Sequence, residues 1–106
     1  LYALDESVAQ GLYGTDADTR CWVRAGTGAT AEELAVFETK DADAAAALVQ
    51  KLEARNADRI ESYSSYIPEE VPKLENAVIL SGGRYVVLCV AKDASAVREA
   101  AEKALG

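Results

Sequence analysis

The stretch Leu34-Ala35-Val36-Phe37-Glu38-Thr39-Lys40-Asp41-Ala42 has a counterpart later in the chain, Val86-Val87-Leu88-Cys89-Val90-Ala91-Lys92-Asp93-Ala94. In both, an apolar run typical of a strand ends in Lys-Asp-Ala and leads into an Ala-rich segment patterned as a helix. Asp suits this junction because its carboxylate accepts hydrogen bonds from the free amides of a helix's first turn. A further apolar run precedes each stretch, at 21–25 and 77–81. The sequence therefore predicts two tandem strand–strand–helix units; the alternative is that the shared junction reflects only the general preference for Asp as a cap.

The expected fold is a single α+β domain, because the length suits one hydrophobic core. We expect two layers: a four-stranded antiparallel sheet with the two main helices on one face, and a short N-terminal helix. Gly82-Gly83 predicts a two-residue hairpin turn between the last two strands, since both positions tolerate a positive φ. The domain, 1–106, divides into an N-terminal helical segment at 1–19, a first unit at 20–66 and a second unit at 77–106.

Apolar stripes at helical spacing show which helix faces should be buried. The long helix begins after Asp41 and ends at about Tyr66, because the residue before Pro68 avoids the helical region. On that helix Arg55 and Arg59 are expected on the solvated side. The expected stripes are Leu4, Val8 and Leu12 on the N-terminal helix, Ala45, Leu48, Val49, Leu52, Asn56, Ile60 and Tyr63 on the long helix, and Ala94, Val97, Ala101, Ala104 and Leu105 on the last helix.

Composition argues against several kinds of function. The chain has 106 residues, a net charge of −7 and no His. An acidic surface repels phosphate backbones and anionic lipid head groups, so neither nucleic acid nor direct membrane binding is expected. Without His the chain lacks the commonest general base and metal ligand. We therefore expect no catalytic residue, no metal site and no cofactor.

The two cysteines, Cys21 and Cys89, both fall in predicted strands. A buried Cys in a strand usually acts as a small hydrophobic side chain. An even count also allows a disulfide. Two alternatives therefore stand at this point: unpaired core thiols, or a bond between the two.

Four stretches together carry a resemblance to a known family. They are Leu12-Tyr13-Gly14-Thr15-Asp16 and the stretches 33–45, 66–77 and 83–94. The chain resembles, over almost its whole length, the bacterial family catalogued as domain of unknown function 4358. Its members occur mostly in predicted lipoproteins of Gram-positive bacteria, with a lipidated Cys upstream of the domain. The resemblance implies an extracytoplasmic domain, lipid-anchored at the cell surface through a segment absent from this chain. It implies no catalytic residue, and Cys21 and Cys89 lie outside the family pattern.

The second face of the predicted sheet is the first candidate site. Alternation places Trp22 and Arg24 on one side of the first strand, and the last strand, which begins near Tyr85, is apolar on both sides. A two-layer domain needs only one buried sheet face. Either the N-terminal segment, 1–19, covers the second face, or a ligand, a protein partner or a second copy of the chain does.

The end of the long helix is the second candidate site. Tyr63 and Tyr66 are rigid, amphipathic side chains of the kind that anchor binding partners. The alternative is a plain helix end, with both rings packed on the core. The neighbouring acids are expected to be solvated, because adjacent side chains point apart and make poor catalytic pairs. These acid pairs are Glu32-Glu33 and Glu69-Glu70.

The function that these observations favour is a non-catalytic binding domain for an unknown protein or small ligand. A self-associating structural module, such as a homodimer, is the alternative, supported by the two-sided apolar sheet. An enzyme that works without His is the least favoured, although carboxylate chemistry would not require His. The candidate binding residues are Trp22, Arg24, Tyr63, Tyr66 and Tyr85.

Overall fold

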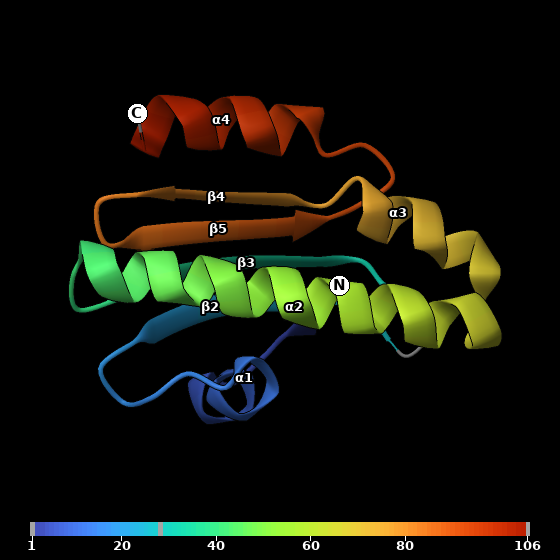
Figure 1. The fold of residues 1–106 in the computed structure, drawn as a ribbon, viewed down its shortest axis with the longest axis horizontal. Coiled ribbons are helices and arrows are strands. Elements are labelled where there is room, and N and C mark those ends of the chain that lie inside the picture. The colour runs from blue at the N-terminus through green and yellow to red at the C-terminus, as the bar shows by residue number, and fades with distance from the viewer. Residues whose placement is uncertain (1, 28, 106) are drawn as a thin grey trace.

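The computed structural model describes residues 2–27 and 29–105. Helices lie on both sides of a single sheet (Figure 1). The elements in chain order are β1 (Tyr2–Ala3), α1 (Glu6–Tyr13), β2 (Arg20–Ala25), β3 (Glu33–Glu38), α2 (Ala42–Tyr66), the 3₁₀ turn η1 (Pro68–Glu70), α3 (Val71–Glu75), β4 (Val78–Gly82), β5 (Tyr85–Val90) and α4 (Ser95–Leu105).

The described strands form one antiparallel sheet in the order β1-β2-β3-β5-β4. The predicted α+β class and antiparallel pairing are confirmed. The predicted number of strands, four, is wrong, because Tyr2 and Ala3 add a short fifth strand at the outer edge of β2. Leu4 continues this extended segment: its amide donates to the Val23 carbonyl over 3.0 Å. It therefore lies before the helix rather than on the helix stripe.

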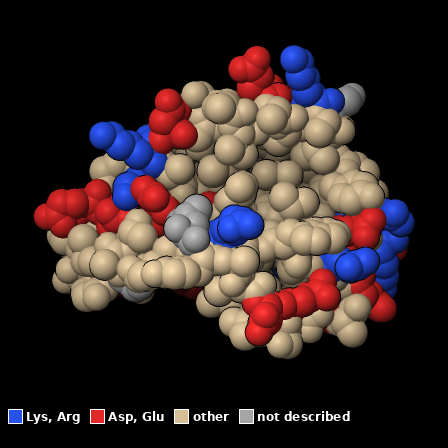
Figure 2. Space-filling view, turned by 180° about the vertical axis from the view of Figure 1, so that it is seen from behind, with Lys and Arg blue, Asp and Glu red and all other residues tan. Residues whose placement is uncertain are grey.

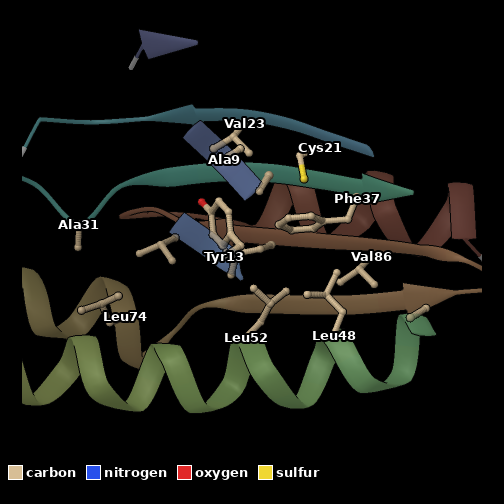
Figure 3. Close-up of a cluster of buried hydrophobic side chains, with 14 residues drawn as sticks. Ala9, Tyr13, Cys21, Val23, Ala31, Phe37, Leu48, Leu52, Leu74 and Val86 are labelled. Atoms are coloured by element: carbon tan, nitrogen blue, oxygen red, sulfur yellow. The ribbon is translucent and has the colours of Figure 1, made fainter. Parts of the chain in front are cut away.

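The first face of the sheet, defined by the inward side chains of Val23, Phe37 and Leu88, is covered by α1 and α2. Tyr13 of α1 meets the Phe37 ring edge-on, with 5.1 Å between ring centroids. Leu48 and Leu52 of α2 point at the same layer (Figure 3). Burial on this face is nearly complete, so it forms the main hydrophobic core. Its buried residues include Ala9, Cys21, Ala35, Ala45, Leu74, Val86 and Val90.

The second face, which carries the side chains that alternate with these, is partly covered by α4. A Cβ at Gly82 would lie 2.5 Å from the Leu105 carbonyl oxygen, so α4 touches this side of β4. Val78, Val87 and Cys89 are buried beneath it. The prediction of two layers with both main helices on one face is therefore wrong. The first face is already filled by α1 and α2, and the remaining apolar surface on β4 and β5 receives α4.

The two strand–strand–helix units share an order of elements but not an arrangement in space. β3 and β5 are antiparallel neighbours at the centre of the sheet. A two-fold axis that exchanges antiparallel neighbours runs perpendicular to the sheet, and it would keep both following helices on one face. α2 and α4 lie on opposite faces. The repeated Lys-Asp-Ala junction is thus not a symmetric duplication. Asp41 directly precedes α2, whereas α4 begins two residues after Asp93, whose carboxylate accepts the Ser95 amide, so Ala94 lies before the helix and not on its expected stripe.

The predicted ends of the long helix are confirmed. The Asp41 carboxylate accepts the Ala44 amide over 2.8 Å, and α2 stops at Tyr66, two residues before Pro68. The predicted Gly82-Gly83 turn is shifted by one residue: Gly82 still pairs with Tyr85, so the turn is formed by residues 83 and 84. Gly83 has a φ of 55°, which favours glycine there.

Two predicted helix stripes differ from the observed ones. In α1 the buried side chains are Ala9 and Tyr13, whereas Val8 and Leu12 are exposed. Tyr13 takes the buried position because its ring packs on Phe37. In α4 only Ala101 is buried among the described residues, and the exposed side chains Ala96, Ala100 and Ala104 border a groove.

Candidate functional site

An apolar groove, called here the second-face groove, runs between α4 and the middle of the sheet. Leu34, Val36 and Val87 form its floor, and its volume is about 600 Å³. Figure 2 shows this side of the molecule, where a broad uncharged region is hollowed at its centre and most charged side chains gather toward the margin. The groove is completed by Tyr85 and by six residues of α4, namely Ala96, Val97, Ala100, Ala101, Ala104 and Leu105.

The groove continues across the sheet toward β2. A second hollow of about 280 Å³ is lined by Trp22 and Arg24 and shares Leu34 and Val36 with the groove. The β2–β3 register explains the continuity, because Trp22 pairs with Val36 and Arg24 with Leu34. Directly paired residues project from the same side of a sheet. One apolar surface therefore extends from α4 to β2.

Three of the predicted binding residues come together on this face: Trp22, Arg24 and Tyr85. Trp22 is half exposed, and the Arg20 guanidinium lies 5.3 Å from its ring centroid. The Tyr85 hydroxyl donates to the Glu38 carboxylate over 2.8 Å. Residues 2–19 leave these three side chains exposed, because α1 packs on the first face, while Ala3 and Leu4 border the smaller hollow. For the described residues, the alternative that the N-terminal segment covers the second face is therefore wrong.

Arg24 differs from Arg20, on the same strand, and from Arg84, in the β4–β5 turn. Arg20 approaches Glu6 to 4.0 Å, and Arg84 pairs with Glu38 at 3.0 Å. Arg24 is exposed and has no ion pair or hydrogen bond with another side chain in the ranges 2–27 and 29–105. It is also the one charged residue among the described residues that line the two connected hollows. The second face therefore presents an apolar groove with an uncompensated positive charge at its border.

The other two predicted binding residues, Tyr63 and Tyr66, lie elsewhere, at the end of α2. The Tyr63 hydroxyl donates to the Thr30 carbonyl over 3.2 Å, whereas Tyr66 is 68% exposed. Glu70 accepts the Thr30 hydroxyl and the Ala31 amide, each over 2.8 Å. These contacts hold the β2–β3 loop against the helix end, so this segment anchors a loop.

Glu70 and its neighbour Lys73 strengthen that anchor. The pKa of Glu70 lies below its ordinary value, chiefly because the Ala31 amide donates to its carboxylate. Lys73 pairs with Glu70 at 3.1 Å and with Glu32 at 3.0 Å, and the bond to Glu32 is the largest cause that raises the pKa of Lys73. The expectation that Glu70 is merely solvated surface charge is wrong, because its side chain is largely buried in these contacts.

A polar cluster that the sequence analysis missed is buried on the first face. Glu33 is only 3% exposed and accepts hydrogen bonds from Arg55 at 2.8 Å, from Arg59 and from the Tyr13 hydroxyl at 2.7 Å. The Arg55 guanidinium also lies 4.4 Å from the Tyr13 ring centroid. The sequence suggested that Glu33, Arg55 and Arg59 are solvated. That prediction is wrong, because Glu33 is buried and both arginine side chains are mostly buried against it. The long side chains of Arg55 and Arg59 reach from α2 to Glu33 of β3 at the edge of the core.

This cluster is satisfied internally. Every buried side-chain nitrogen and oxygen among the described residues has a hydrogen-bond partner. Burial, and then the charge of Glu33, raises the pKa of Tyr13, so its phenol keeps its proton and continues to donate to that carboxylate. An inward-facing Glu in β3 was readable from its alternation with Ala35 and Phe37. The cluster ties α1, α2 and β3 together.

Cys21 and Cys89 are both buried and unpaired. Cys21 lies opposite Phe37 in the strand register, on the first face, whereas Cys89 lies opposite Val78, on the second face. Of the two alternatives left by the sequence, the structure therefore selects unpaired thiols. Burial raises the pKa of both thiols, which keeps them protonated near neutral pH.

Among known families, the one described as "Domain of unknown function (DUF4358)" has a model that matches residues 3–91. The chain belongs to this family. The resemblance found in the sequence is thereby confirmed. No curated protein and no solved structure matches the chain.

The DUF4358 match ends before α4 begins at Ser95. α1, α2 and the strands β2 to β5 lie within the match, while one side of the second-face groove lies beyond it. No helix within residues 2–27 and 29–105 is long and apolar enough to cross a membrane. In that same part of the chain, no cluster of His, Cys, Asp or Glu side chains is arranged to hold a metal ion.

Proposed function

We propose that this DUF4358 domain is a non-catalytic ligand-binding domain and that its ligand occupies the second-face groove. The observation that supports this most directly is the groove itself. Its volume of about 600 Å³ falls in the range of roughly 300–1,000 Å³ that is typical of small-molecule sites. Its lining is almost entirely apolar, so removing a hydrocarbon surface from water would drive binding.

The chemistry of the groove supports binding over catalysis. The described lining residues offer one phenol, at Tyr85, and one guanidinium, at Arg24, together with aliphatic side chains and the Trp22 ring. Cys21 also borders the smaller hollow, but its thiol belongs to the buried core of the first face. The pKa of that thiol is raised by burial. A general acid or base works best when its pKa lies near the working pH. A lining made mainly of aliphatic and aromatic side chains favours a binding surface over a catalytic site.

The proposed setting is the outer surface of a bacterial cell, where a lipid anchor upstream of this chain would hold the domain. The family resemblance in the sequence supports this setting. A tagged full-length protein tests it: we expect the protein in the membrane fraction and its tag accessible to protease on intact cells. Recovery in the cytoplasmic fraction would contradict the proposed location and leave the binding proposal untouched.

Binding is tested with the uncharged fluorescent probe N-phenyl-1-naphthylamine. Ala100 is exposed and faces the groove, so Ala100→Phe should fill the groove and weaken probe binding at least tenfold. Ala54 is exposed on α2, away from the groove, and Ala54→Phe is the matched control. Equal probe binding by the wild type and both variants would contradict the proposal.

Self-association through the same face is the second candidate function, since Trp22 is half exposed beside the groove. Sedimentation velocity separates the two. A dimer that Ala100→Phe dissociates and Ala54→Phe leaves intact would favour self-association, whereas a monomer that binds the probe favours the ligand site.

A further inference from the structure

We propose that the ligand of the second-face groove is a single-chain amphiphile free in solution, with a straight hydrocarbon chain and one anionic end group held by Arg24. This inference rests on the proposed function and specifies its ligand class. It is carried by the shape of the groove, by the lack of free backbone groups in its floor and by the unpaired charge at its border.

The wall of the groove is straight and smooth. Ala96, Ala100 and Ala104 recur every four residues on α4 and are all exposed toward the groove. Residues at this spacing lie on one side of a helix, and at about 1.5 Å of rise per residue they extend for roughly 12 Å. Methyl side chains along such a length form a wall beside which an extended hydrocarbon chain can lie.

The floor of the groove offers no backbone hydrogen bonds. Leu34 and Val36 belong to β3, which pairs with β2 and β5, and Val87 belongs to β5, which pairs with β3 and β4. Interior strands have both edges occupied, so an extended peptide in the groove would bury unpaired amides, which is unfavourable. A hydrocarbon chain has no such groups, and the floor therefore favours it over a peptide strand.

The concave shape argues against a second copy as the occupant. A symmetric dimer places the same patch of each protomer against itself, so that patch must be self-complementary. Two facing hollows of about 600 Å³ would leave a void unless a third molecule filled it, and voids at an apolar contact lose packing energy.

Charge identifies the end group. The chain has a net charge of −7, yet the charge that borders the groove is positive. Arg24 pairs in register with Leu34 of the floor, and paired residues in an antiparallel sheet have Cα atoms about 5 Å apart. Its guanidinium has no carboxylate partner among the described residues. A carboxylate or similar anion at the mouth of the groove would supply one.

Titration of the folded domain with dodecanoate and with dodecanol, both below their micelle or solubility limits, tests the inference. Trp22 is the only tryptophan and lines the hollow beside Arg24, so its fluorescence reports binding. We expect dodecanoate to bind about three- to fivefold more tightly than dodecanol, the range of a partly exposed ion pair. Arg24→Gln should remove this difference, whereas Lys103→Gln, an equal charge change on the exposed side of α4, should keep it.

Any other result would contradict a specific part of the proposal. Equal affinities that Arg24→Gln does not alter would overturn the anionic end group while leaving the groove as a binding site. Binding only to vesicles that contain anionic phospholipid would overturn the choice of a free amphiphile. Failure of both ligands and of N-phenyl-1-naphthylamine would overturn the proposed function itself. Dimers that Ala100→Phe dissociates would identify a second copy as the occupant.

Discussion

The two faces of the sheet differ in how completely they are covered. On the first face, α1 and α2 seal a core in which Phe37 is fully buried and the one inward carboxylate, Glu33, has all its partners. On the second face, α4 covers β4 and β5 but leaves the floor of the groove partly exposed. Both faces are apolar in sequence. Apolar composition therefore does not distinguish a surface that holds the fold together from one that is left partly open.

The difference follows from which helix packs where. α2 has 25 residues and contributes the buried side chains Ala45, Leu48 and Leu52, whereas α4 has 11 residues and buries only Ala101. Small side chains on α4 keep the gap to Leu34 and Val36 open. We expect the stability of the domain to depend mainly on the first face, and its binding mainly on the second.

The largest expected effect comes from emptying the core of the first face. Phe37→Ala should lower the free energy of unfolding by about 3–5 kcal/mol, because a fully buried aromatic ring leaves a cavity. Changing its neighbour Val36, which lies on the second face, to Ala should lower the free energy of unfolding by less than about 1 kcal/mol. Urea denaturation measures both. Should Phe37→Ala not fold, Phe37→Leu should still cost about 1 kcal/mol or more. Equal costs at positions 36 and 37 would contradict the contrast between the faces.

The next effect is expected from the buried ion cluster. Glu33→Gln should cost about 2–3 kcal/mol, because Arg55 and Arg59 lose the charge that compensates them in a mostly buried site. Glu53, an exposed acid on α2, provides the matched change Glu53→Gln, which should be nearly neutral. Denaturant unfolding of the two variants gives the comparison. A Glu33→Gln variant as stable as the Glu53→Gln variant would show that the cluster contributes nothing to the first face.

The elements that sequence predicted well are those fixed by local chemistry. The carboxylate of Asp41 caps α2 as expected, and Pro68 ends the helix region as expected. The strands at the centre of the sheet also followed from short apolar runs. These features depend on a few neighbouring residues, so one sequence is enough to predict them.

The features that sequence did not predict depend on contacts between distant elements. The side of the sheet taken by α4 could not be read from its Ala stripe, because both faces of β5 are apolar and α1 and α2 decide which face is free. Trp22 and Arg24 could be assigned to one face by alternation, but the groove beside them required the position of α4. Arg55 and Arg59 were misplaced because a long side chain can reach a buried partner from the border of a helix face.

A change at the contact between α4 and the sheet should loosen the second face alone. Gly82→Ala would place a Cβ 2.5 Å from the Leu105 carbonyl oxygen and 2.7 Å from its Cβ, so α4 must shift. We expect a loss of about 1–3 kcal/mol in unfolding free energy and a several-fold faster reaction of the Cys89 thiol with a disulfide reagent. Single-cysteine variants, Cys21→Ser and Cys89→Ser, distinguish the thiols. Cys21, on the first face, should react at an unchanged rate; equal acceleration of both would contradict a local effect.

The smallest effect concerns the anchor of the β2–β3 loop. The Ala31 amide and the Thr30 hydroxyl donate to Glu70 and lower its pKa in the folded state. A lowered pKa means that the unfolded chain binds the proton more readily, so this stabilisation is complete above the ordinary pKa of about 4.3. It is lost as the pH falls through the folded-state pKa.

Glu70→Gln should therefore cost about 1 kcal/mol at pH 7, and the difference from the wild type should shrink below about pH 4. Glu69→Gln, a change at an exposed neighbour, is the matched control and should cost little at pH 7. Unfolding curves recorded between pH 3 and pH 7 provide the measurement. Because the anchor lies away from the groove, binding of N-phenyl-1-naphthylamine by Glu70→Gln should match the wild type. A change in both properties would mean that the loop anchor and the second face are coupled, and the division of roles between the two faces would then fail.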